Sequence, residues 1–297
     1  MNKLFRTLVL VSLSLVVITT ASCKKRATSV ADMELPEATQ TESSADNSQA
    51  DEMQTHVYTV VHTEVSNVEE QSFKTGGSQL PSDKCASIYI SWDSTMLNSI
   101  KHKYVDTMII DYGQVAGCTW GGRTKKGRVI ITKKCKMSDV GCKITAVLDS
   151  FYVDDYRVKG TATLENQGYT IAELTLHTIL NDGKIISPDN KFASFTTDRY
   201  YKISPGNNRT IINVFGTSDG VNHLGETYSA TVTPEQALMF IDDCRYPLKG
   251  IVTITSPGSP ALEVDFSGGT GACDNLAVVK INGTKYKQTL KPSFGWY

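Results

Sequence analysis

The sequence lacks an excess of charge of either sign. It holds 30 Lys and Arg against 31 Asp and Glu, which gives a formal net charge of -1 over 297 residues. Affinity for nucleic acid comes largely from basic side chains that neutralise phosphates, so we expect no nucleic-acid partner. Hydrophobic residues make up 40% of the chain, which is too many for a wholly disordered protein and typical of a globular one.

The sequence also lacks the common motifs of catalytic and cofactor sites. It has no H-E-x-x-H, Walker or G-x-G-x-x-G motif, and therefore none of the local geometries that those motifs build. Its five histidines are scattered: His56, His62, His102, His177 and His223. Neither C-x-x-C pairs nor a D-x-D-x-D run occurs, so zinc and calcium sites are not expected. We predict no catalytic residues, no metal, no cofactor and no enzymatic activity; an envelope enzyme of unknown class is the least favoured alternative.

Long apolar runs are absent after residue 18, so no later segment is expected to span a membrane. The one apolar run, residues 8–18, follows the basic residues Lys3 and Arg6. It is too short to cross a hydrocarbon core of about 30 Å comfortably as a helix. Its length and its flanks predict a secretory signal peptide.

Small residues before Cys23 resemble the lipobox of bacterial lipoproteins, with Thr20 where Leu is common. The resemblance implies that residues 1–22 are removed and that Cys23 carries the lipid, whose acyl chains anchor a protein stably. A plain signal peptide cleaved elsewhere is the alternative. We predict a protein of the cell envelope, anchored by lipid in the outer membrane.

The next segments have contrasting compositions. Residues 23–49 hold many Ser, Thr, Glu and Asp residues and no aromatic residue, so we predict a flexible tether. Within residues 50–82 we predict an amphipathic helix and a linker. The helix is indicated by apolar residues three and four positions apart: Met53, Val57, Val60, Val61, Val65 and Val68. It either packs on the following domain or pairs with a partner.

Residues 83–292 have the texture of β-sheet, and residues 293–297 form a tail. Turn residues recur every 8 to 14 positions, and residues 170–180 alternate apolar with polar side chains, as in a half-buried antiparallel strand. Asn181-Asp182-Gly183, Asp219-Gly220 and Asn282-Gly283 are typical of hairpin turns. We predict an all-β fold: an extended antiparallel sheet, either a meander or a sandwich, preceded by one short helix.

Two stretches of the body repeat one pattern, at about residues 85–133 and 244–290. Each has a Cys before a strand, a strand ending in Asp and an aromatic residue, a Gly-rich turn and a second Cys. The repeat predicts the disulfides Cys85–Cys118 and Cys244–Cys273, and it leaves Cys135 and Cys142 as a third pair. An even cysteine count in an exported chain favours disulfides. The alternative is that some of these cysteines are reduced and buried.

The same stretches carry a resemblance to a family. Residues 111–132 are similar to D-[FY]-G…G-C-T…G-R-T-[RK]-[RK]-G-K-I-x-[VI]-T, and residues 265–283 to D-[FY]-G…C-D-[NK]-x-A-x-V-x-[IV]-N-G. These signatures belong to an uncharacterised group of Bacteroidota envelope lipoproteins. The resemblance implies an all-β lipoprotein on the cell envelope and attaches no activity to it. The chain departs from the pattern at residues 114–116 and at Ser267, where Gly is usual.

A few exposed features suggest binding or modification. Four basic residues cluster near one hairpin, Arg123, Lys125, Lys126 and Arg128; they are a candidate polyanion site or, alternatively, protect an edge strand. Aromatic residues that could stack on sugars or on one another are Trp120, Tyr152, Tyr156, Tyr200, Tyr201 and those of the tail. Ser94 and Thr107 resemble O-glycosylation sites of Bacteroidota.

From these features we expect a lipid-anchored envelope protein that acts as a structural or binding module. Its partners would be the membrane, through the lipid at Cys23, and either a glycan or another envelope protein. Capture of a carbohydrate or a polyanion by the sheet face is the alternative.

Overall fold

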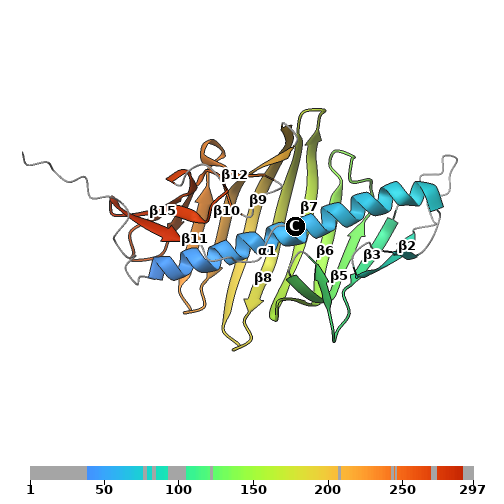
Figure 1. The fold of residues 1–297 in the computed structure, drawn as a ribbon, viewed down its shortest axis with the longest axis horizontal. Coiled ribbons are helices and arrows are strands. Elements are labelled where there is room, and N and C mark those ends of the chain that lie inside the picture. The colour runs from blue at the N-terminus through green and yellow to red at the C-terminus, as the bar shows by residue number, and fades with distance from the viewer. Residues whose placement is uncertain are drawn as a thin grey trace, which may run out of the picture.

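One helix lies across one broad sheet. The computed structural model describes residues 39–75, 79–81, 85–92, 105–120, 123–206, 209–241, 244, 246–268 and 273–289. In this part of the chain a single α-helix, α1 (Thr39–Thr75), crosses the strands of a sixteen-stranded sheet (Figure 1). A helix of 37 residues is about 55 Å long, enough to cross about eleven strands. No helix in these residues is long and apolar enough to span a membrane.

The sheet is an open antiparallel meander. Its strands are β1 (Gln79–Pro81), β2 (Ser87–Trp92), β3 (Val105–Asp111), β4 (Cys118–Trp120), β5 (Arg123–Lys133), β6 (Lys143–Val153), β7 (Tyr156–Tyr169), β8 (Leu174–Ile186), β9 (Phe192–Gly206), β10 (Arg209–Val221), β11 (Thr227–Val232), β12 (Leu238–Ile241), β13 (Ile251–Thr255), β14 (Leu262–Asp265), β15 (Leu276–Ile281) and β16 (Thr284–Thr289). Short 3-10 helices occupy Pro234–Gln236 and Phe266–Gly268.

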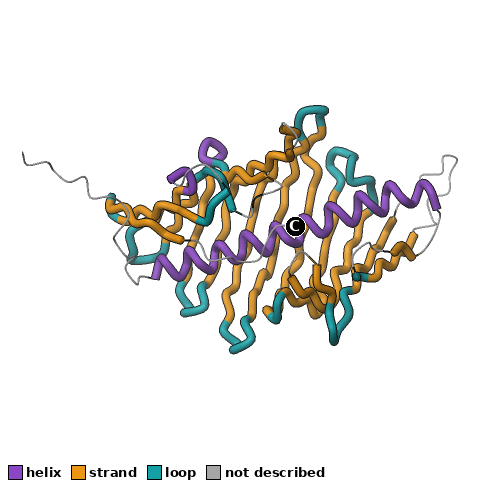
Figure 2. Tube along the Cα trace, viewed as in Figure 1, coloured by secondary structure: helices purple, strands orange, loops and turns teal. Residues whose placement is uncertain are grey.

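Strand order in the sheet follows chain order, except that β4 pairs only with β5 and β12 with β10. Figure 2 shows the loops gathered along the two long margins of the sheet, where one strand turns into the next. The predicted all-β fold class is confirmed. Of the two arrangements that we predicted, a meander and a sandwich, the structure shows the meander.

The two faces of the sheet have different environments. Strand β11 alternates strictly: Tyr228, Ala230 and Val232 are buried, and the residues between them are exposed. The buried set faces α1, because an antiparallel sheet covered on one side has one apolar and one polar face. The other face, which we call the open face, carries the exposed and half-buried residues.

The predicted apolar positions of the helix form its contact with the sheet. All six are buried: Met53, Val57, Val60, Val61, Val65 and Val68. They belong to one core with inward-facing residues such as Ile131, Leu164 and Leu180. The helix therefore packs on its own domain, which was one of the two predicted arrangements.

The start of the helix corrects the predicted tether and the predicted helix length. Residues 39–49, expected to be flexible, belong to α1, which is long rather than short and ends at Thr75. Polar contacts hold this first part: Asn222 Nδ2 donates to Ser43 Oγ at 3.1 Å, and the His223 backbone N–H donates to the Asp46 carboxylate at 2.7 Å. The prediction of disorder rested on composition, which indicates how much apolar surface a segment can bury but not which hydrogen bonds it can form.

Two of the predicted hairpin turns are wrong. Asn181-Asp182-Gly183 lies inside β8, where the register against β9 shifts between Leu180 and Gly183 and Asp182 has a φ of 52°. This is a β-bulge, which uses the same left-handed backbone as a tight turn. Asp219-Gly220 lies inside β10. Asn282-Gly283 does connect β15 to β16, with φ of 49° and 80°.

Candidate functional site

Disulfides brace both ends of the sheet. Cys85 is bonded to Cys118 and Cys244 to Cys273, as the repeat predicted. Cys85 precedes β2 and Cys118 begins β4, whereas Cys244 precedes β13 and Cys273 lies between β14 and β15, at sequence separations of 33 and 29. The predicted pairing is confirmed, including the third bond discussed below.

The repeat also builds the same turn twice. Asp111 Oδ1 accepts a hydrogen bond from the backbone N–H of Gly113 at 2.8 Å, and Asp265 Oδ1 accepts one from Ser267 N–H at 2.8 Å. The aromatic residue inside each turn, Tyr112 or Phe266, is 7% exposed. Ser267, which departs from the family pattern, therefore keeps the turn through its backbone, and the two ends of the sheet share one local structure.

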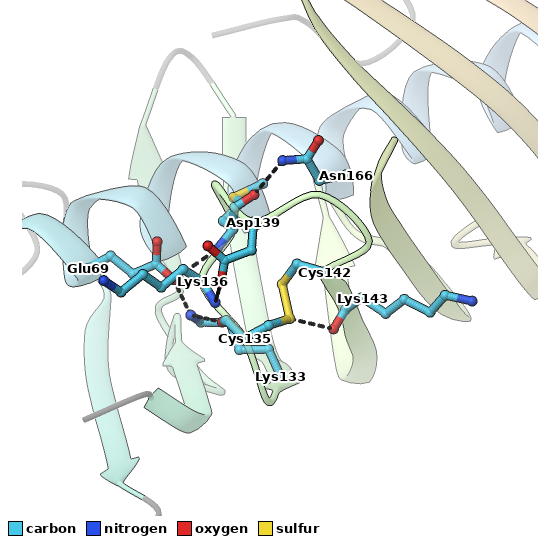
Figure 3. Close-up of a disulfide and its surroundings, with 9 residues drawn as sticks. Glu69, Lys133, Cys135, Lys136, Asp139, Cys142, Lys143 and Asn166 are labelled. Carbon is cyan, nitrogen blue, oxygen red and sulfur yellow. Dashed lines mark hydrogen bonds and ion pairs between the residues drawn. A yellow bond between two sulfur atoms is a disulfide. The ribbon is translucent and has the colours of Figure 1, made fainter. Parts of the chain in front are cut away.

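The third disulfide, Cys135–Cys142, closes the loop between β5 and β6 and lies against the helix (Figure 3). The Glu69 carboxylate of α1 accepts hydrogen bonds from Lys133 Nζ and, at 3.1 Å, from the Met137 backbone N–H. Lys133 is 5% exposed and also donates to the Cys135 carbonyl at 2.9 Å. This buried lysine is thus paired and hydrogen-bonded, and it fixes the loop to the last part of the helix.

Further polar contacts lie beneath the middle of α1. Arg199 on β9 pairs with Asp51 at 2.7 Å. Gln54 Nε2 donates to Thr178 Oγ1 at 2.7 Å. Burial keeps His56 neutral: its pKa is lowered to about 3, first by desolvation and then by the charges of Lys125 and Arg123. We therefore expect protonation of His56 to oppose the packed state.

The predicted basic cluster exists but is largely neutralised. All four residues lie on β5, and three of them form ion pairs: Arg123 with Asp154, Lys126 with Asp155 at 3.2 Å, and Arg128 with Asp149. The carboxylates come from β6 and from the turn between β6 and β7. Because an acidic partner offsets each of these charges, the cluster gives little support to polyanion binding.

Lys125, the fourth basic residue, lies on the buried face of the strand. It is 4% exposed, and its Nζ lies 5.4 Å from the centroid of the Tyr112 ring. A cation over an aromatic face is attracted by the ring. The explanation by edge protection is wrong, because β5 lies between β3 and β6 and is not an edge strand.

The predicted aromatic residues divide between the two faces. Tyr201 is 1% exposed, and its hydroxyl lies 3.0 Å from Thr55 Oγ1 of α1. Tyr200, its neighbour, stands on the open face between His177 and Phe215, at ring-centroid distances of 4.4 and 5.4 Å. Tyr152 and Tyr156 are half-buried, and the side chain of Trp120 and the tail lie outside the described residues. The cross-strand stack is therefore one aromatic feature of the open face.

The open face also carries an array that the sequence analysis missed. Cross-strand pairing places seven threonines at one level of the sheet: Thr107, Thr132, Thr145 and Thr163 on β3, β5, β6 and β7, and Thr217, Thr231 and Thr253 on β10, β11 and β13. We call these seven residues the threonine row. Between its halves, β8 and β9 contribute Ile179 and Asp198 at the same level. Only the register of the sheet brings these residues into line.

The structure does not test the two predicted modifications, O-glycosylation and lipidation. Thr107 is half-buried at the end of the threonine row, and its O-glycosylation stays a prediction. Ser94 and Cys23 lie outside the described residues.

Comparisons with protein-family models, curated proteins and solved structures returned no match. Within the described ranges, no group of three or more His, Cys, Asp or Glu side chains is placed to hold a metal ion. The candidate site is therefore the open face itself, with its threonine row, aromatic stack and paired charges.

Proposed function

We propose that the protein is a lipid-anchored binding module of the bacterial cell envelope. The observation that carries this proposal is the one-sided construction of the sheet: α1 covers one face, and the other presents ordered polar and aromatic side chains to solvent. A wide sheet that is covered on one face only suits recognition of an extended ligand or of another envelope protein.

The six cysteines of the body support a location outside the cytosol. All six are paired in three disulfides, and such bonds persist in oxidising compartments and are rare in the cytosol. The predicted signal peptide and the lipidation of Cys23 agree with this location. Fifteen residues separate Cys23 from the start of α1, so the body would lie within about 55 Å of its anchor.

Metabolic labelling tests the anchor. Cells that make the wild-type protein or the Cys23→Ala variant are grown with radioactive or clickable palmitate, and the protein is isolated by immunoprecipitation. We expect label in the wild type and none in the variant, together with movement of the variant out of the membrane fraction. Equal labelling of the two proteins would overturn the anchor. A Cys85→Ala control should keep the label, because that sulfur belongs to a disulfide.

A further inference from the structure

The threonine row offers hydroxyl groups at regular intervals. Adjacent strands of a sheet lie about 4.8 Å apart, so the threonines within each half of the row repeat at that spacing. All seven side chains are exposed or half-buried. Within the described part of the chain, none of their hydroxyls is engaged by another protein group. The row is therefore a regular series of donors and acceptors available to a ligand.

The preference of β-strands for threonine does not explain this alignment. Threonine is common in strands because β-branched side chains pack well on a pleated surface, and that preference acts at every exposed level. The next level of the open face carries threonine at three positions, Thr161, Thr196 and Thr255, against seven in the row. The hydroxyls are thus concentrated along one line across the sheet.

The charges of the open face indicate an uncharged ligand. Ion pairs join neighbouring segments on both sides of the row: Arg128 with Asp149, Lys143 with Glu165, and Lys202 with Glu173. At the level of the row itself, Asp198 Oδ1 lies 2.7 Å from His177 Nε2, Lys280 pairs with Glu263 at 3.0 Å, and Lys285 lies opposite Lys280. Such paired charges attract neither a polyanion nor an anionic membrane surface. The polar groups that repeat along the row are the uncharged threonine hydroxyls.

Apolar groups run beside the hydroxyls. The rings of His177, Tyr200 and Phe215 stack on β8, β9 and β10, one level away from the row, which carries Ile179, Asp198 and Thr217 on these strands. On the opposite side, Ile130 and Val147 pair across β5 and β6. A strip of hydroxyls bordered by apolar side chains matches a pyranose, which has apolar ring faces and hydroxyl edges.

We propose that the threonine row binds an extended, uncharged polysaccharide that lies across the strands. Successive sugar units would meet successive threonines, so affinity would rise with chain length until the ligand fills the row. The inference rests on the proposed function, since it names the ligand class of that same open face.

Affinity electrophoresis tests the inference. The full-length protein, purified in detergent, is run in native gels that contain laminarin, hydroxyethyl cellulose, xylan or mannan, with alginate and polygalacturonate as polyanions. We expect retardation by at least one neutral polysaccharide, weaker retardation by its short oligosaccharides and none by the polyanions. Retardation by the polyanions alone, or by none of these polymers, would overturn the inference.

Matched variants locate the site. Thr132→Val/Thr145→Val/Thr163→Val removes three adjacent hydroxyls but keeps β-branched side chains, so the sheet should still fold. We expect its affinity to fall at least tenfold, while the corresponding triple serine variant and Thr227→Val bind within about twofold of the wild type. Unchanged binding by the triple valine variant would show that the row is not the site.

Two controls separate this inference from the proposed function. Sedimentation of the wild type and the triple valine variant should give the same monomeric mass; a wild-type dimer that the substitutions dissociate would identify a second copy as the occupant and overturn the inference. Palmitate labelling at Cys23 is independent of both results. A protein that is labelled but binds no neutral polysaccharide refutes the ligand class and leaves the anchored module standing.

Discussion

The guanidinium of Arg199 on β9 meets the carboxylate of Asp51 on α1 across 148 positions of sequence. Arg199 Nε and Nη2 both donate to Asp51 Oδ1, at 3.0 and 2.7 Å. The arginine side chain is 1% exposed and the aspartate 22%. This contact is one of several that join the helix to the sheet, and it pairs a buried cation with a carboxylate.

Removal of that carboxylate should destabilise the protein strongly. Asp51→Ala leaves Arg199 charged, buried and without its ion-pair partner, a change that costs about 3–5 kcal/mol at comparable sites. The free energy of unfolding in urea, followed by circular dichroism, measures the loss. The double variant Asp51→Leu/Arg199→Leu should lose much less, because it removes both charges. An Asp51→Ala variant as stable as the wild type would show that the pair does not hold the helix.

His56 should make stability depend on pH in the acid range. Its folded pKa of about 3 lies below its ordinary value of 6.5, so the unfolded chain binds the proton first as pH falls. Stability is then complete above pH 6.5 and is lost as pH falls toward 3. Between pH 7 and pH 5 the loss due to His56 is about 2 kcal/mol.

The His56→Leu variant tests this dependence. Urea unfolding gives the free energy of unfolding at pH 7 and at pH 5. The difference between these two values should be smaller in the variant than in the wild type by about 2 kcal/mol. Some dependence should remain, since burial also lowers the pKa of His62. Identical pH dependence in the two proteins would contradict the buried, neutral state of His56.

The disulfides should differ in their contribution to stability. Cys85→Ala/Cys118→Ala opens a loop with a separation of 33 residues, and Cys135→Ala/Cys142→Ala one of 7. Loop-closure entropy predicts losses of about 4 and about 2 kcal/mol. Thermal and urea unfolding of the two variants, carried out without reductant, measures both losses of stability. A larger loss for the short loop would indicate that its contacts with Glu69, rather than chain entropy, dominate.

The two repeated turns should respond alike to substitution. Asp111→Ala and Asp265→Ala each remove one side-chain acceptor from a backbone N–H, and each should cost about 1 kcal/mol. The corresponding Asn variants keep an acceptor oxygen and should stay close to the wild type. Unfolding free energies of the four variants give the comparison, and clearly unequal losses in the two Ala variants would undo the structural equivalence of the turns.

Features that depend on neighbouring residues were predictable from the sequence. The apolar spacing of Met53, Val57 and Val61 predicted the buried face of α1. The repeated Asp-aromatic and Cys pattern predicted two disulfides, because each copy supports the same local hairpin and turn. Alternation within single strands predicted the fold class.

Features that depend on long-range register were not predictable. The same left-handed conformation serves a turn at Asn282 and a bulge at Asp182, and only the continuation of β8 beyond the bulge separates the two. The partners of the basic cluster, such as Asp149 for Arg128, become visible once β5 is aligned with β6. The threonine row likewise requires the register of every strand that it crosses.

The central claim is that a lipid at Cys23 holds this disulfide-braced sheet on the envelope, outside the cytosol. Mass spectrometry of the mature protein, purified from the membrane without reductant, tests it most directly. The account predicts a chain that begins at Cys23, carries the mass of a diacylglyceryl group with or without a further acyl chain, and has all six remaining cysteines in three disulfides. A chain that begins at Met1, or an unacylated chain with free thiols, would contradict it.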